Sequence, residues 1–412
     1  MTTTASRTPA SALTVALCFL VAVVEGFDLQ VMSAIGPLVR ADLHLGAQQL
    51  GFIFSSGLVG LGIGATLGGY VADRIGFKRV IVLAAFVMGV STLATAMVFD
   101  YWTLFAARVV TGIAIGGAMP NTLVLVESGV ERSRAAGVVT LMLCGIPAGG
   151  IVAALASHVF AASLGWRGVL VFGGVLALLS AVASQLWLVE PRSAAGRRQG
   201  RRGLVAVLFG EGRALTTALL WLLMVMSLAV VALLANWLPT LVVDKGLPAS
   251  AAFSTLLAWN VGGALGIVVV GHICDRLGPR TTLLLGYLGM AVLFVLFAKS
   301  STADTFMLFA VVVNFFVAGS HYTVYGLSPR LYPPDGAGTG VGANMAIGRV
   351  GSITGPSVAG IFLGAGGTGG QVILGLMPIA VLCAVIVIAL VAASRGRLDP
   401  PVQAVPLPAS GK

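Results

Sequence analysis

The ionisable side chains inside the apolar runs of this sequence are few, and two of them could carry protons. Glu25 and Asp28 are three residues apart in one apolar run, so a helix would place both carboxyl groups on one face. Burial favours the neutral form of a carboxyl group, and a neighbouring carboxylate favours it further. We therefore expect Asp28 and Glu25 to take part in binding and releasing a proton. The alternative is a structural pair that an arginine neutralises permanently.

Two arginines, Arg108 and Arg349, also lie inside apolar runs. A guanidinium group offers a planar fork that matches a carboxylate, so Arg349 could bind an anionic substrate. It could instead pair permanently with a carboxylate of the chain. Arg108 could assist proton release by pairing transiently with Asp28, or it could form a static bridge between two helices. The sequence leaves these alternatives open.

Four residues in the second half of the chain could contact a ligand. His321 could hydrogen-bond a phenolic hydroxyl or a carboxylate, and Tyr325 lies one helical turn beyond it. Trp259 and Asn260 could stack on an aromatic ring or hydrogen-bond to it. The alternative for each of the four is ordinary packing between helices.

The composition places all of these residues in a membrane protein. Of the 412 residues, 58% are hydrophobic and only 9% are charged, whereas a soluble domain carries roughly a quarter charged residues. The net charge of +10 does not indicate nucleic-acid binding, because most basic residues flank apolar runs or lie in one stretch near the middle. The four cysteines lack metal-ligand spacing, so we expect neither a disulfide framework nor a metal centre.

Apolar segments long enough to cross a bilayer as helices occur twelve times. They cover residues 12–38, 49–72, 80–99, 103–126, 137–160, 168–189, 215–242, 251–273, 281–298, 304–328, 338–363 and 372–393. We therefore predict an all-α integral membrane protein of twelve transmembrane helices. Its expected parts are a six-helix half over 1–189, a basic linker over 190–213 and a second six-helix half over 214–412.

The positive charges predict the orientation of these helices. With both termini in the cytoplasm, 18 of the 24 Lys and Arg residues lie on the cytoplasmic side and four lie in outer loops. Cytoplasmic loops of membrane proteins carry such an excess. We therefore predict a multi-pass protein with both termini in the cytoplasm.

An internal repeat indicates that the two halves are alike. Five residues of the loop after the second segment recur 202 positions later, with Lys78 replaced by arginine. The two sets are Gly69, Asp73, Arg74, Gly76 and Lys78, and Gly271, Asp275, Arg276, Gly278 and Arg280. Two like halves are typical of transporters whose site lies at the interface between the halves. Charged groups at helix ends could latch one conformation, so we predict a gating role for both loops; the alternative is solvated loop charge.

The repeated loop motif resembles the signature of the major facilitator superfamily, and the resemblance covers essentially the whole chain. The motif Arg108-Val-Val-Thr-Gly112, followed by Gly116-Gly117, looks like that superfamily's second motif. The resemblance implies two pseudo-symmetric six-helix halves and transport by alternating access.

Further motifs are similar to those of the aromatic acid:proton symporter family within this superfamily. They are Glu25-Gly26-Phe27-Asp28, Trp237-Leu238-Pro239-Thr240 and Gly348-Arg349-Val350-Gly351 followed by Gly355-Pro356. The string Cys18-Phe19-Leu20-Val21-Ala22 with Asp28-Leu29-Gln30 looks like the hydroxyphenylpropionate branch of that family. The chain departs from the family pattern at Glu25, where aspartate is more frequent, at Ala337 and at His321, where a glutamine is common.

The resemblance implies a symporter that imports an aromatic carboxylate with protons, and 3-(3-hydroxyphenyl)propionate is the expected substrate. Asp28, Glu25 and Arg108 would couple the proton, and Arg349 would hold the carboxylate. The expected setting is the inner membrane of a bacterium, with the protein as a monomer and with no cofactor beyond the proton gradient. Alternatives are import of a benzoate- or cinnamate-type acid and proton-coupled drug export. An enzyme is disfavoured, because the sequence shows no nucleophile–base pair or phosphate-binding loop.

Overall fold

The computed structural model describes residues 12–130, 132–189, 204–333 and 336–394, and these residues form helices and short connections without a strand. Lipid offers no hydrogen bonds to the backbone, so apolar segments of this length become helices. The helices are α1 (Ala12–Asp42), α2 (Ala47–Ile75), α3 (Phe77–Thr95), α4 (Tyr101–Gly129), α5 (Arg132–Trp187), α6 (Leu204–Phe209), α7 (Ala214–Asp244), α8 (Ala249–Lys299), α9 (Ala303–Leu327), α10 (Ala337–Gly364), α11 (Gly369–Leu374) and α12 (Leu376–Ala393), with short 3₁₀ turns at Gly210–Gly212 and Ser328–Leu331.

Two of the ten membrane-length helices in the described residues are folded back on themselves. Gly165 interrupts α5 with φ 67°, and Gly278 interrupts α8 with φ 77°. Glycine adopts this left-handed region without the steric cost of a Cβ atom. Counting α5 and α8 as two runs each gives twelve runs, in agreement with the expected spans.

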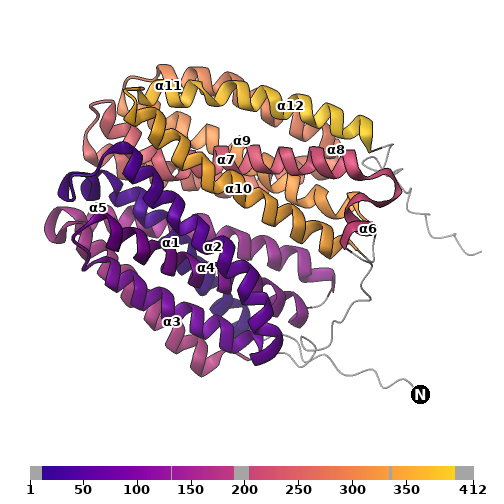
Figure 1. Ribbon diagram of the computed structural model, residues 1–412, viewed down its shortest axis with the longest axis horizontal. Helices are drawn as coiled ribbons and strands as arrows, with labels where there is room; N and C mark the ends of the chain where they lie inside the picture. The colour runs from indigo at the N-terminus through magenta and orange to yellow at the C-terminus, as the bar shows by residue number, and fades with distance from the viewer. Residues whose placement is uncertain (1–11, 131, 190–203, 334–335, 395–412) are drawn as a thin grey trace, which may run out of the picture.

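The helices form two bundles, which Figure 1 shows as an indigo-to-magenta half and a pink-to-yellow half. In the first half, α1 packs along α5, α2 along α4, and α3 between α4 and α5. In the second half, α8 folds back and packs along α9 and α12, while α7 packs along α10. The halves meet where α2 contacts α10, α5 contacts α8 and α1 contacts α7.

The repeated loop has the same backbone conformation in both halves. Gly76 ends α2 with φ 94°, and Gly278, its counterpart 202 positions later, has φ 77°. A residue with a side chain would be strained at either position. The internal repeat is therefore a structural repeat.

Glycines bring α2 and α4 into backbone contact. A Cβ atom added at Gly112 would lie 2.0 Å from the carbonyl oxygen of Gly57. One added at Gly64 would lie 2.0 Å from the carbonyl oxygen of Ile113. Small residues at such crossings let membrane helices pack closely without the hydrophobic effect that drives packing in water.

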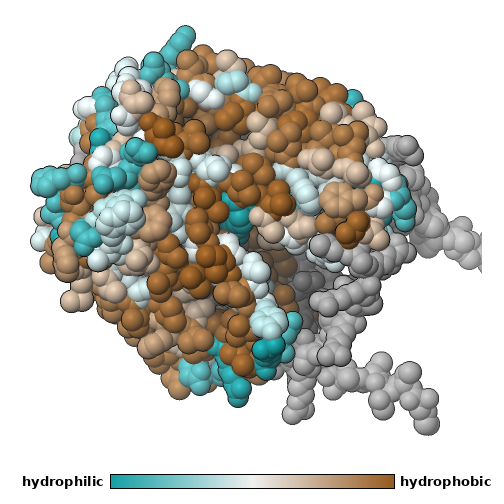
Figure 2. Space-filling model, in the orientation of Figure 1, coloured by the Kyte–Doolittle hydropathy of each residue, from teal (hydrophilic) through white to brown (hydrophobic). Residues whose placement is uncertain are grey.

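The outer surface of the bundle is apolar along its flanks. Large apolar side chains from both halves are exposed there, among them Phe86, Leu179, Leu288 and Ile388. Figure 2 shows brown, apolar side chains over most of the visible flank, polar ones gathered toward the ends, and a hollow between the two halves. This surface suits a protein surrounded by lipid.

The end of the bundle where α1 meets α2, which we call the Asp42 end, is closed by contacts between the halves. Arg40 forms an ion pair with Asp244, at 3.2 Å. Deeper in the bundle, the side chains of Gln30 and Asn260 exchange two hydrogen bonds of 2.8 Å each. By the charge rule this end faces outward.

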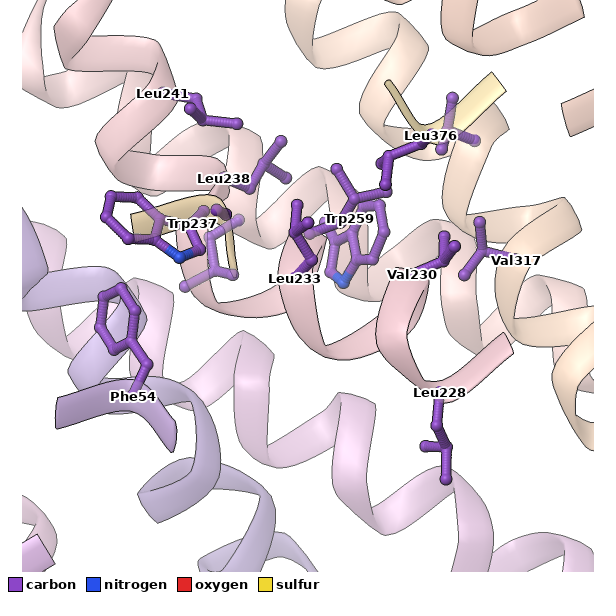
Figure 3. Packing of buried hydrophobic residues seen from close by; sticks show 14 of the residues in the cluster. Phe54, Leu228, Val230, Leu233, Trp237, Leu238, Leu241, Trp259, Val317 and Leu376 are labelled. Carbon is purple, nitrogen blue, oxygen red and sulfur yellow. The ribbon is translucent and has the colours of Figure 1, made fainter. Parts of the chain in front are cut away.

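Two further contacts cross between the halves toward the same end. Phe54 of α2 meets Trp237 of α7 edge to face, with ring centroids 5.4 Å apart (Figure 3). Ser55 donates a hydrogen bond of 2.7 Å to the carbonyl of Ile353 and accepts one of 2.7 Å from Ser357. Together these contacts hold the halves against each other at the Asp42 end.

The predicted linker over 190–213 lies largely outside the described residues, but its last part is visible. It forms α6 and a 3₁₀ turn, and Arg213 folds back to donate 3.1 and 3.2 Å hydrogen bonds to the carbonyls of Val207 and Ala206. Thr217 at the start of α7 donates a further hydrogen bond of 2.6 Å to Leu208. The end of this segment is therefore attached to the second half.

Candidate functional site

Asp28 lies in the middle of α1 and is almost fully buried. Its carboxylate accepts a hydrogen bond of 2.8 Å from Thr92 of α3 and one of 3.4 Å from Arg108 of α4. Arg108 also donates a hydrogen bond of 3.1 Å to the backbone carbonyl of Asp28. Three helices of the first half thus converge on this carboxyl group, and its charge is paired in this conformation.

The space that Arg108 occupies is left open by a glycine. A Cβ atom at Gly57 of α2 would lie 3.4 Å from a terminal nitrogen of Arg108. The guanidinium also borders a small cavity between the halves, to which Asn236 of α7 contributes. Arg108 therefore contacts Asp28, as both of its predicted roles require. It also lies near the second half of the protein.

Glu25, one turn before Asp28, is fully buried, and neither of its carboxyl oxygens has a hydrogen-bond partner among the described residues. A carboxylate ion without a partner is costly to bury, whereas the neutral acid is much less so. The surroundings of Glu25 therefore suit a carboxylic acid that holds its proton. The two predicted proton-coupling carboxyls have unlike surroundings, one paired and one alone.

Asn260, a predicted substrate contact, is paired with Gln30 across the half interface. Its amide also donates a hydrogen bond of 2.9 Å to the carbonyl of Leu256. A Cβ atom at Gly150 of α5 would lie 2.4 Å from Asn260 Oδ1 and 2.5 Å from Gln30 Nε2, so the pair fits only beside a glycine. In this conformation the amide of Asn260 joins the two halves.

Trp259, the neighbour of Asn260, is 2% exposed and packs in the main apolar cluster, which contains residues of both halves. Figure 3 shows its ring beside Leu233. Asn314 of α9 donates a hydrogen bond of 2.7 Å to its backbone carbonyl. In this conformation the ring of Trp259 is buried among apolar side chains.

Arg349, His321 and Tyr325 all lie in the second half, on two different helices. Arg349 lies midway along α10, and α7 packs against both α10 and α9. The rings of His321 and Tyr325 meet edge to face at 4.9 Å, and Tyr322 stacks on Tyr325 at 5.9 Å. His321, Tyr322 and Tyr325 thus form an aromatic cluster on α9.

The guanidinium of Arg349 makes no hydrogen bond or ion pair within the part of the chain that the structure describes. Its side chain is only partly buried, so it can be reached from the space between the helices. Such a guanidinium offers hydrogen-bond donors whose geometry matches an anion with two oxygens. The permanent pairing that the sequence left open for Arg349 is not seen in these residues.

The predicted gating residues lie at the end of the bundle opposite Asp42. Asp73 and Arg74 are exposed, and so are Asp275 and Arg276 in the second half. Arg74 donates a hydrogen bond to the hydroxyl of Tyr70 and lies over its ring. Gly69 near the end of α2, Gly76 between α2 and α3, and Lys78 at the start of α3 are partly buried. The loops are thus placed where a conformational latch would have to lie.

The sequence analysis did not identify three residues of the candidate site, which are Gln30, Thr92 and Ser227. Gln30 follows Asp28 by two positions, and a polar amide in an apolar run was a usable signal. Thr92 and Ser227 gave none, because hydroxyl side chains are common in membrane helices and their partners are 64 and 94 residues away. Among the described residues no group of three His, Cys, Asp or Glu side chains could hold a metal ion.

The sequence matches the model of the Major Facilitator Superfamily over residues 18–270 and 253–411. It is 36% identical over 400 residues to the 3-(3-hydroxy-phenyl)propionate transporter of Escherichia coli (strain K12), covering 96% of this chain and 98% of the relative. It is 33% identical to the gallate transporter of Pseudomonas putida, covering 85% of each chain.

A bacterial homolog of the human lysosomal transporter Spinster, solved in an inward-facing and unoccupied conformation, has a similar fold. The two structures superpose with a TM-score of 0.78 at 16% identity, over 94% of this chain and 98% of the other. At this identity the likeness concerns the fold alone.

Proposed function

This chain belongs to the Major Facilitator Superfamily, and we propose that it is a symporter that imports an aromatic carboxylate together with protons. The chain is a multi-pass membrane transporter and not an enzyme. The substrate we favour is 3-(3-hydroxyphenyl)propionate, the acid that gives the relative from Escherichia coli its name. The setting we propose is a bacterial inner membrane, with a monomer whose two termini lie in the cytoplasm.

The observation that carries this proposal is that Arg349, midway along α10, has no partner among the described residues and lies in the same half as the aromatic cluster of α9. A carboxylate would bind the guanidinium through two parallel hydrogen bonds. An aromatic ring attached to it would lie against Tyr325 and Tyr322, whose rings stack on each other. The site therefore supports an acid that combines one carboxylate with one aromatic ring.

The buried carboxyls of α1 give the proton a place to bind. The Asp28 carboxylate is paired with Arg108, and its protonation would release that arginine. Glu25 lacks a partner among the described residues and suits the protonated form. A change in either group alters the packing of α1 against α3 and α4, which would link protonation to the movement of the helices.

The membrane potential supplies a reason for coupling to protons. An inside-negative potential opposes entry of an anion by about 2.3 kcal/mol per charge per 100 mV. Entry with one proton is electroneutral, so the pH gradient can drive it. Entry with a second proton also uses the potential.

The test is uptake of labelled 3-(3-hydroxyphenyl)propionate into proteoliposomes with an imposed inward proton gradient. We expect accumulation in the wild type and none above equilibrium in Asp28→Asn. Asp304→Asn, the same change at an exposed position at the start of α9, should accumulate like the wild type. Arg349→Gln should lose uptake, and Arg349→Lys should keep only part of it, because lysine keeps the charge without the planar fork.

The outcomes separate the parts of the proposal. Accumulation that survives in Asp28→Asn moves the coupling to Glu25. Uptake of a benzoate- or cinnamate-type acid in place of the favoured acid corrects the substrate within the aromatic carboxylates. Reconstituted protein that accumulates none of these acids, but expels a cationic drug against the gradient, refutes the import of aromatic acids.

A further inference from the structure

A buried hydrogen bond to His321 brings the hydroxyl group of Ser227 into the candidate site. The Oγ atom of Ser227 on α7 lies 3.2 Å from Nδ1 of His321 on α9, and both side chains are buried. It is the hydrogen bond that the structure records for His321 within the described residues. The orientation of the imidazole ring therefore depends on a residue from another helix.

The position of Ser227 relative to Arg349 is set by glycines of α10. A Cβ atom at Gly351 would lie 1.8 Å from the carbonyl oxygen of Val225, and one at Gly355 would lie 2.5 Å from the carbonyl oxygen of Ala229. Helices α7 and α10 are therefore in backbone contact on either side of Ser227. Helix α7 therefore links the helix of Arg349 to the helix of His321, through its contact with α10 and through the Ser227–His321 hydrogen bond.

The hydroxyl group of Tyr287 lies near Ser227. Tyr287 of the second run of α8 and Ser227 line the same small cavity, whose other walls are mostly apolar. The phenolic hydroxyl is buried without a hydrogen bond of good geometry among the described residues, yet Ser227 is close enough to interact with it. A rotation of either hydroxyl lets Tyr287 donate to Ser227, and a buried hydroxyl favours such a partner.

The direction of these hydrogen bonds decides which nitrogen of His321 carries its proton. A neutral imidazole has one donor nitrogen and one acceptor nitrogen. A charged imidazolium is costly to bury without an anionic partner, and the structure records only Ser227 as a hydrogen-bond partner of His321 among the described residues. If Tyr287 donates to Ser227 and Ser227 donates to Nδ1, the proton of His321 lies on Nε2.

We propose that Ser227, supported by Tyr287, is a positioning residue that holds His321 as an Nε2–H donor beside Arg349. Nε2–H and the guanidinium then both offer hydrogen atoms to the substrate carboxylate, which only accepts. The specificity this confers is for an ionised acid over its ester or amide. The proposal deepens the function proposed above and rests on it for the identity of the substrate.

The kinetic test compares Ser227→Ala with the wild type in proteoliposome uptake. Loss of one hydrogen bond typically weakens binding about threefold to tenfold, so we expect KM to rise by that factor while kcat changes less than about twofold. Ser227→Thr, which keeps the hydroxyl, should restore KM, and Tyr287→Phe should raise KM in the same direction. Ser320→Ala removes a buried hydroxyl next to His321 in the sequence and should leave KM unchanged.

Two comparisons separate positioning from a structural role. In a His321→Gln background, Ser227→Ala should have no further effect on KM, because the glutamine amide carries its own donor. The preference for the acid over its methyl ester, measured by competition, should narrow in Ser227→Ala. If the effects of the two substitutions on KM add in the double variant, the proposal is wrong. It is also wrong if Ser227→Ala narrows the preference for an acid with a ring hydroxyl over one without it, and not the preference for the acid over its methyl ester.

A measurement that does not depend on transport tests this proposal independently of the proposed function. Nitrogen-15 NMR of histidine-labelled protein reports which ring nitrogen is protonated, and the chain has four histidines, so His321→Gln assigns the signal. We expect the Nε2–H tautomer in the wild type and a mixture in Ser227→Ala. An Nδ1–H tautomer in the wild type refutes the proposal even if the protein transports the acid, and failed transport with the Nε2–H tautomer refutes the substrate alone.

Discussion

Replacing Gly150 by alanine should open the Asp42 end of the bundle. The added Cβ would lie 2.4 Å from Asn260 Oδ1 and 2.5 Å from Gln30 Nε2, closer than any unstrained contact. Both amides would have to move, and their two reciprocal hydrogen bonds of 2.8 Å would be lost. Because these bonds join the halves, their loss should favour a conformation in which the halves part at this end.

The expected size of the shift follows from the two hydrogen bonds. Each contributes about 0.5–1.5 kcal/mol net, so their loss amounts to about 1–3 kcal/mol. Every 1.4 kcal/mol changes an equilibrium tenfold, so the ratio of open to closed protein should rise about 5- to 150-fold. The double variant Gln30→Leu/Asn260→Leu removes the same bonds without a clash and should shift the ratio in the same direction.

Pulsed electron–electron resonance measures this ratio directly. Spin labels on Met97 and Ser301, exposed residues at the Asp42 end of the two halves, should show a longer distance gaining population in Gly150→Ala. The control is Gly137→Ala in the same helix, where an added Cβ meets nothing within 4 Å. An unchanged distance distribution in both Gly150→Ala and the leucine double variant would show that the amide pair does not hold this end closed.

Three smaller predictions concern the helix contacts and ends. Gly112→Ala should lower the thermal stability in detergent, by about 1–3 kcal/mol for an overpacked contact, while Gly62→Ala, into open space, should not. Asp100→Ala should lower the Tm at neutral pH, because hydrogen bonds from the backbone and hydroxyl of Thr103 hold the pKa of the Asp100 carboxyl below its usual range. In a pH series, the difference in Tm between the wild type and the variant should vanish as pH falls through that lowered pKa. Arg40→Gln should change the label-distance ratio less than about fivefold, because a half-exposed ion pair contributes at most about 1 kcal/mol, and a larger change would contradict this.

The spans and the internal repeat could be predicted because each depends on neighbouring residues. Hydropathy over about 20 residues decides whether a segment crosses a membrane, and the helices α1 to α4 lie within a few residues of their expected bounds. The fold-back at Gly278 was foreseeable from its likeness to Gly76, since both glycines occupy the left-handed region. Gly165 lies in the gap between the expected spans 137–160 and 168–189, whereas the break at Gly375 between α11 and α12 lies inside the expected span 372–393.

The candidate site could be predicted as residue types and depths but not as partnerships. Asp28 and Arg108 meet, as both predicted roles of Arg108 require, and Arg349 has no partner among the described residues. The pairing of Asn260 with Gln30 was not foreseen, because these residues are 230 positions apart and belong to different halves.

The sequence by itself determined that this chain crosses a membrane, how its spans divide into two like halves, and which rare polar groups lie at depth. Those properties follow from the cost of burying charge and bare backbone in lipid, which acts residue by residue. The tertiary structure decided which polar groups meet, which end is closed, and that Arg349 has no partner among the described residues. Close approaches such as that of Gly150 to the Gln30–Asn260 pair set these contacts, and they depend on the packing of several helices at once.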